Sequence, residues 1–213
     1  MRRRKALPPC SKDLGADEVV SGGQTMNPST ESILAGVDKI PAETVFILPN
    51  NGNIIMAAQT VQRLDGKSMW WSFPPKTVPQ GITAMMNVDF ESPDPESITE
   101  AMTQSLSSVT TAQITYAARD SEFDGFHIKE GDYLALQEGK LFGTDTSIEA
   151  LLAKLAAEAV SRSAEFVSLY FGEDVAEEDA QQAADVFRTH CPDTEVAVLS
   201  GGQPVYYYII SIE

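Results

Sequence analysis

The sequence predicts an α/β protein made of two successive α/β subdomains. Three short apolar runs in the first half, at residues 18–20, 45–48 and 69–73, each lead into a polar Gly/Asn/Pro loop and then into an amphipathic helix. Apolar runs this short, alternating with helices, are typical of parallel strands joined by crossover helices. The second half contains closely spaced strands with DG, EGD and EG turns, which predict a mixed sheet with a small antiparallel meander.

The helices of the first half are expected directly after the three polar loops, at residues 28–40, 54–64 and 82–88. Asn27 is a good N-cap and Pro28 suits a first helical position, so the first helix should begin there. A further helix is expected at 97–107, because Asp94 and Pro95 together form a helix start signal.

The second half has a longer series of elements. Strands are expected at residues 110–119, 123–129, 133–137, 140–142, 165–171, 194–199 and 205–212. A capping box at Thr146-Ser147-Ile148-Glu149 predicts a strong helix that ends near Ser161. An acidic helix is expected at 176–190, and His190 at its C-terminus is well placed against the helix dipole. His127 is expected in a strand of the meander, in a structural or exposed position.

Acidic residues and prolines cluster at residues 89–95, which indicates a subdomain boundary. We therefore expect a disordered lead-in at 1–12, an N-terminal α/β subdomain at 13–92 and a C-terminal α/β subdomain with the meander at 93–213. With 213 residues, the chain is long enough for cores that are stable without disulfides.

The composition excludes several classes of protein. The net charge is −16, although four of the 15 basic residues fall in the first five positions, so the chain should repel nucleic acid and anionic lipid. The sequence has no apolar run of the roughly 18–20 residues that a membrane span needs, and no apolar stretch follows the basic start as in a signal peptide. Two cysteines and two histidines form neither a disulfide framework nor a zinc motif, which indicates the cytoplasm.

The polar loops of the first half contain no Asp or Glu, in a chain that is otherwise acidic. Loops that follow parallel strands meet at one edge of a sheet, where ligands bind. Amides, hydroxyls, one lysine and helix N-termini suit a carboxylate, a phosphate or a partner's backbone, and suit Mg²⁺ poorly. The alternative is that these residues only form turns and caps. The candidate binding residues are Gly22, Gly23, Gln24, Thr25, Asn27, Ser29, Asn50, Asn51, Asn53, Lys76, Thr77 and Gln80.

The tetrapeptide SGGQ occurs at residues 21–24 and again at 200–203. It lacks the spacing and the Lys-Ser/Thr of a phosphate-binding loop, and it is not a nucleophile elbow. Three consecutive tyrosines follow the second copy; β-propensity explains most of this run, and an aromatic contact patch is the alternative. The candidate binding residues of the second half are Gly202, Gln203, Tyr206 and Tyr208.

Several longer segments closely resemble the C-terminal region of the fatty-acid kinase A family, which is related to dihydroxyacetone kinases. The resemblance covers residues 11–213 and rests on the segments GGQTMNPSTESIL, FILPNNGNIIMAA, KTVPQGITAMM, ITYAARD, FGEDVAEEDA and GGQPVYYYIISIE. It implies a fold like that of the DegV fatty-acid-binding proteins, with two α/β subdomains and a cleft between them. It also implies that the two GGQ loops are comparable turns in the two halves. Pro74-Pro75 departs from the Pro-Thr-Lys-Thr expected there, which removes one hydroxyl from any anion site.

The resemblance further implies a kinase component that does not transfer phosphate by itself. Mg-ATP would belong to a separate DhaL-type domain, so no cofactor is expected in this chain. The expected partner is a DegV-like carrier whose bound acyl carboxylate is phosphorylated. Two other functions stay open: a protein that binds a fatty acid or a phosphorylated ligand in the cleft, and a free-standing enzyme.

Overall fold

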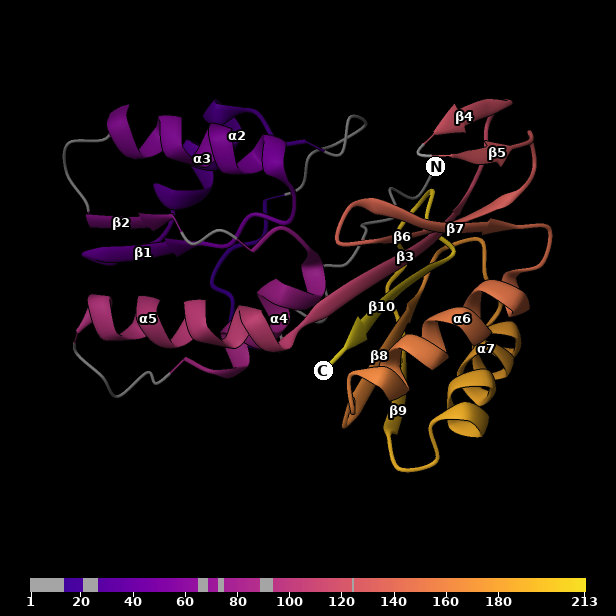
Figure 1. The fold of residues 1–213 in the computed structure, drawn as a ribbon. Coiled ribbons are helices and arrows are strands. Elements are labelled where there is room, and N and C mark those ends of the chain that lie inside the picture. The colour runs from indigo at the N-terminus through magenta and orange to yellow at the C-terminus, as the bar shows by residue number, and fades with distance from the viewer. Residues whose placement is uncertain (1–13, 21–26, 65–68, 73–74, 89–93, 124) are drawn as a thin grey trace. The chain divides into compact units, whose positions relative to one another are not determined.

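The computed structural model describes residues 14–20, 27–64, 69–72, 75–88, 94–123 and 125–213 (Figure 1). The described residues divide into two compact units, one ending at Val109 and the other beginning at Thr110. The helix at 95–105 thus belongs to the first unit, whereas the sequence analysis placed it in the second. No helix among the described residues is long and apolar enough to cross a membrane.

The first unit has helices on both sides of a parallel pair of strands. Its elements are α2 (Thr30–Val37), β1 (Thr44–Ile47), α3 (Gly52–Leu64), β2 (Met69–Ser72), α4 (Val78–Met86), α5 (Pro95–Ser105) and the 3₁₀ turn η2 (Leu106–Ser108). The strands pair in parallel from Thr44 opposite Met69 to Ile47 opposite Ser72. This confirms the predicted parallel pair and its crossover helix α3.

Alternation along β1 divides the first core between the two faces of the sheet. Val45 packs in a cluster with residues of α2 and α3, whereas Phe46 packs against Ala84 of α4 and Met102 of α5. Figure 1 shows α2 and α3 on one side of the strands and α4 and α5 on the other. Successive side chains of a strand point to opposite faces, so one short strand serves both clusters.

The predicted strand at 18–20 is wrong, because the structure assigns no strand to these residues. Val20 instead lies against Gly36 of α2, so closely that a Cβ at position 36 would stand 2.6 Å from the valine Cγ2. Glu18 also pairs with Lys39, with 2.7 Å between the carboxylate and the ammonium group. The segment therefore packs on a helix instead of extending the sheet.

Two helix starts differ from the prediction. The N-cap of α2 is Ser29, not Asn27, because the serine Oγ accepts the backbone N–H of Ser32 at 3.1 Å. Helix α4 begins at Val78, four residues before its predicted start, because Thr77 caps it. The start of α5 is confirmed: Asp94 accepts hydrogen bonds from the backbone N–H groups of the first turn, which lower the pKa of its carboxyl together with a bond from the Ser97 hydroxyl.

The second unit is a six-stranded mixed sheet with two helices on one face (Figure 1). Its elements are β3 (Thr110–Tyr116), β4 (Ser121–Phe123), β5 (Phe126–Ile128), β6 (Tyr133–Gln137), β7 (Lys140–Asp145), α6 (Ile148–Ser161), β8 (Phe166–Phe171), α7 (Glu177–His190), β9 (Glu195–Ser200) and β10 (Tyr208–Ile212). The strand order is β7-β6-β3-β10-β8-β9, and only β8 and β9 are parallel.

The predicted mixed sheet and antiparallel meander are confirmed, with two differences. Strand β5 pairs with β4 in a separate hairpin instead of joining the meander. The N-cap of α6 is Ser147, whose Oγ accepts the backbone N–H of Ala150 at 3.3 Å, so the predicted capping box from Thr146 to Glu149 is wrong. The core lies between the sheet and helices α6 and α7, and Phe187 of α7 is the largest fully buried side chain in the described chain.

Replacing Phe187 by alanine should lower the free energy of unfolding by about 3–5 kcal/mol, because the substitution leaves a cavity in a closed core. Urea unfolding followed by circular dichroism measures this loss. Val160→Ala, at an exposed position of α6, is the control and should change the free energy by less than about 0.5 kcal/mol. Equal effects of the two substitutions would contradict the described core.

Candidate functional site

The first unit brings a set of polar side chains to one edge of its sheet. Strands β1 and β2 are parallel and end opposite each other, so the chain leaves both at the same edge. We call the described residues there the polar edge: Asn27, Ser29, Asn50, Asn51, Asn53, Lys76, Thr77 and Gln80. The other predicted members of this site, Gly22, Gly23, Gln24 and Thr25, lie outside the described residues.

Asn51 connects two loops of the polar edge. Its Nδ2 donates to Oδ1 of Asn27 at 3.1 Å and to Oδ1 of Asn50 at 3.4 Å. Its Oδ1 accepts the backbone N–H groups of Asn53 at 3.0 Å and of Ile54 at 3.1 Å. The same amide therefore caps α3 and holds the loop before α2 beside the loop after β1.

The other caps of the polar edge also use their oxygens locally. Thr77 Oγ1 accepts the backbone N–H of Gln80 at 3.4 Å, and Oε1 of the buried Gln80 accepts the backbone N–H of Lys76 at 2.9 Å. Ser29 caps α2 and lies 3.0 Å from the hydroxyl of Ser32. The exposed side chains of Asn50 and Lys76 are therefore the groups best placed to meet a ligand or a partner.

The electrostatic character of the polar edge comes from what surrounds the caps. Residues 44–64 and 69–88 contain no Asp or Glu, and neither α3 nor α4 has an acidic residue in its first turn. The N-terminus of a helix carries a partial positive charge and unpaired N–H groups. Without nearby carboxylates to neutralise it, this edge favours an anionic group.

The candidate residues of the second unit lie in or beside the loop after β9. Gln203 is 3% exposed, and its Nε2 donates to the carbonyl of Tyr170 at 2.9 Å. Tyr208 is 4% exposed, its hydroxyl donates to the carbonyl of Asp179 at 3.4 Å, and burial raises its pKa to about 12. Both side chains are used inside the unit. Gly202 has a φ of 60°, a left-handed conformation that suits glycine, and Tyr206 is half-buried.

The SGGQ spelling has a structural reason in its second copy. A Cβ at Gly201 would collide with Oε1 of Gln203, so the first glycine makes room for the buried amide. A Cβ at Gly172, after β8, would likewise collide with the carbonyl of Tyr206. The first copy lies outside the described residues, so the comparison of the two turns stays a prediction.

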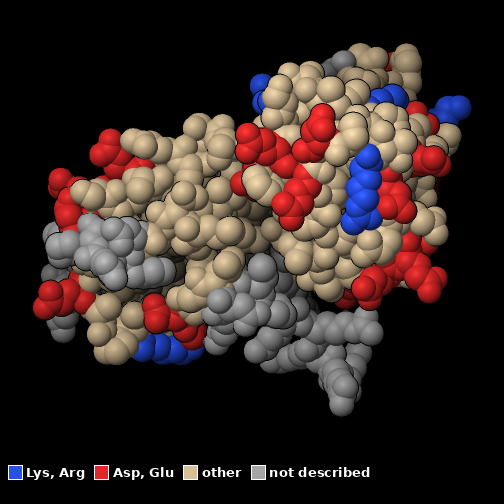
Figure 2. All heavy atoms as spheres, turned by 90° about the horizontal axis from the view of Figure 1, so that it is seen from below, with Lys and Arg blue, Asp and Glu red and all other residues tan. Residues whose placement is uncertain are grey.

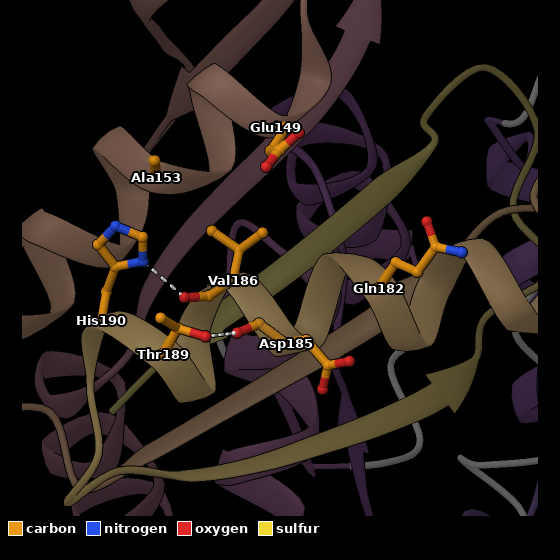
Figure 3. Close-up of a pocket in the computed structure, with 7 residues that line it drawn as sticks. All are labelled: Glu149, Ala153, Gln182, Asp185, Val186, Thr189 and His190. Carbon is orange, nitrogen blue, oxygen red and sulfur yellow. Dashed lines mark hydrogen bonds between the residues drawn. The ribbon is translucent and has the colours of Figure 1, made fainter.

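A hollow of about 270 Å³ lies between α6 and α7 in the second unit (Figure 3). It is lined by Glu149, Ala153, Gln182, Asp185, Val186, Thr189 and His190, none of which was a candidate. His190 Nδ1 lies 2.8 Å from the Val186 carbonyl, one turn earlier in the same helix. Among the described residues, no group of three or more His, Cys, Asp or Glu is placed to hold a metal ion.

The structure also brings together three tyrosines that the sequence analysis did not connect. The rings of Tyr116 and Tyr207 have centroids 6.2 Å apart, and those of Tyr133 and Tyr207 have centroids 5.7 Å apart in an edge-to-face arrangement. The run at 206–208 was the available signal, but which tyrosine meets which depends on strand pairing across β3, β6 and β10.

Comparison with solved structures places the chain in the class of DegV-like α/β folds, as expected. A DegV family protein from Corynebacterium glutamicum matches with a TM-score of 0.67 at 15% identity, covering 98% of this chain and 92% of that one. The fatty acid binding protein DegV from Bacillus subtilis matches with a TM-score of 0.64 at 12% identity, covering 87% and 76%. The dihydroxyacetone kinase from C. freundii matches with a TM-score of 0.59 at 9% identity, covering 88% and 42%.

The particular family follows from sequence. The FakA-like family, the C-terminal domain of proteins similar to fatty acid kinase A, matches residues 5–213, and the chain belongs to it. Protein YloV of Bacillus subtilis is 39% identical over 204 residues, and an uncharacterized protein of Staphylococcus aureus (strain USA300) is 34% identical over 203 residues. Each alignment covers 95% of this chain but 36% of the relative, so the chain spans about a third of their length.

Replacing Asn51 by alanine should lower the free energy of unfolding of the first unit by about 1 kcal/mol or more, because α3 loses its cap. Asn51→Asp is the matched variant: it keeps the capping oxygens and should lose less stability. Hydrogen exchange of the first turn of α3 measures both. Equal exchange in the two variants would mean that the cap contributes nothing.

Replacing Gly201 by alanine should lower the free energy of unfolding by about 1–3 kcal/mol, because the new methyl group displaces the buried Gln203 amide from its carbonyl partner. Gly52→Ala is the control, since a Cβ there has no atom within 4 Å and alanine favours a helix start over glycine. Thermal unfolding of the two variants should therefore move in opposite directions.

Proposed function

We propose that this chain is a non-catalytic docking domain of a fatty-acid kinase. It engages a fatty-acid-carrying DegV-like protein, so that the acyl carboxylate bound by that partner is phosphorylated by an ATP-binding domain outside this chain. Membership of the FakA-like family supports a place in the fatty-acid kinase system. The short span of the relatives that the chain covers agrees with one domain acting alongside others.

The observation that carries the proposal is the acid-free polar edge on a chain of net charge −16. Acidic side chains outnumber basic ones on the face drawn in Figure 2. A contact surface of amides, one lysine and helix N-termini stands out against this background. Complementary charge raises association rates and sets the orientation of a complex, so this edge suits the approach of an acidic patch on the partner.

A second candidate function is the binding of a small anionic lipid or phosphorylated compound. Solved neighbours of the same fold include a fatty acid kinase B3 protein from Streptococcus pneumoniae loaded with linoleic acid. In this chain, the polar edge would then hold the head group. Native mass spectrometry of the purified chain, with and without added oleate, measures such a ligand directly. A bound mass supports this candidate, and a clean apo mass in both samples contradicts it.

The docking proposal is tested by titrating the chain calorimetrically with the DegV-like carrier of the same organism, loaded and unloaded. Lys76→Glu should weaken binding about three- to tenfold, because it adds a like charge at the contact edge. Lys140→Glu is the matched control, an exposed lysine in the β6–β7 turn of the other unit, and should leave the affinity unchanged.

The outcomes separate three cases. Binding that Lys76→Glu alone weakens supports docking at the polar edge. Equal loss in the two variants would mean that overall charge, and not this edge, controls the affinity. No binding at high micromolar concentration by the folded chain would refute docking altogether, and a difference between loaded and unloaded carrier would mean that the domain senses the acyl chain.

A further inference from the structure

The second unit carries a half-exposed tyrosine cluster, made of Tyr116, Tyr133 and Tyr207. Tyr207 lies between the other two rings, tilted by 57° from Tyr116 and by 72° from Tyr133. The ring of Tyr116 is 48% exposed, although aromatic side chains of this size are usually buried. The edge-to-face arrangement leaves aromatic faces, which carry negative partial charge, available to a ligand.

The residue beside the cluster has a strained backbone. Val205 has a φ of 73°, which is rare for a β-branched residue, and its side chain is 52% exposed. The hydroxyl of Thr115, next to Tyr116 on β3, donates to the Val205 carbonyl at 2.9 Å and helps to hold this conformation. Strained residues held in place by their neighbours cluster at functional sites.

The topology places the cluster at the edge of the sheet where parallel strands end. Strands β3 and β8 both pair antiparallel with β10, with Ile114 and Phe171 opposite Tyr208, so β3 and β8 run in the same direction. The loop after β9, which is parallel to β8, supplies Val205 and Tyr207. Ligands of α/β proteins collect at the carboxyl ends of such strands.

The surroundings of the cluster are acidic. Asp132 directly precedes Tyr133, and its carbonyl accepts the backbone N–H of Ala117 at 2.8 Å. Asp174 lies close enough to act on Tyr207: burial, the two neighbouring tyrosines and this carboxylate together raise the pKa of the Tyr207 hydroxyl. Residues 117–132 contain five acidic residues against two basic ones. The cluster therefore attracts cations, the opposite of the polar edge.

We propose that the tyrosine cluster binds an arginine-bearing segment of a partner polypeptide. The guanidinium group stacks on the exposed face of Tyr116, and the carboxylates of Asp132 and Asp174 pair with its charge. Arginine fits better than lysine, because its planar, weakly hydrated group stacks on aromatic rings. The site lies on a different unit from the polar edge, so it goes beyond the docking role proposed above.

The test is an NMR titration of the full chain with a blocked Arg-Gly-Arg-Gly-Arg peptide and its lysine counterpart. Shifts should concentrate on the amides of Tyr116, Val205 and Tyr207, and the arginine peptide should bind more tightly. Tyr116→Leu should weaken arginine binding about threefold, since it removes the stacking face but keeps an apolar side chain. Phe166→Leu is the matched control, at 51% exposure and the opposite end of the sheet, and should change nothing.

Asp174→Asn provides a second variant that leaves the rings intact, and it should weaken binding of the arginine and lysine peptides alike. Circular dichroism checks the fold of each variant. Arginine and lysine peptides that bind equally, or shifts spread over the acidic helix α7, would mean general attraction to an acidic chain and would overturn the proposal. So would equal affinities of Tyr116→Leu and Phe166→Leu. Because no carrier is used, failure here leaves the docking proposal standing.

Discussion

The second unit depends on the insertion of its last strand between two others. All five residues of β10 are buried, and the strand pairs on one side with β3 and on the other with β8. Without it, the meander β3-β6-β7 and the parallel pair β8-β9 would share no hydrogen bonds between strands. The same strand fixes the loop before it, because the Tyr207 N–H donates to Ile114 and the Tyr207 carbonyl accepts from Gly172. Core and aromatic cluster thus have one origin.

The sequence predicts those parts of the fold that depend on local periodicity. The acidic helix α7 and strand β6 lie almost where expected, since their apolar spacing and turn residues decide them. The segment 18–20 has the composition of a strand, but tertiary packing on Gly36 determines its structure. Helix starts moved because Ser29 and Thr77 are as good caps as the residues first chosen, and only backbone geometry distinguishes them.

The two candidate surfaces differ in how much the sequence reveals. The polar edge follows from loops that are each continuous in sequence, so its residues could be named in advance, although the bond from Asn51 to Asn27 could not. The tyrosine cluster draws on β3, β6 and the loop before β10, and a shift of one residue in register would turn its side chains to the other face. Gln203 was expected at a surface because glutamine is usually exposed, but Gly201 makes room for it inside.

The contrast in charge between these surfaces limits what one partner can do. A segment attracted by Asp132 and Asp174 carries positive charge, and the polar edge, with Lys76 and acid-free helix starts, would repel it. A partner that uses both surfaces must therefore present an acidic patch to one and an arginine to the other. Such opposed pairing sets orientation as well as affinity, because a reversed complex brings like charges together. The strongly acidic background strengthens this selection, since it weakens any approach by an acidic protein away from the polar edge.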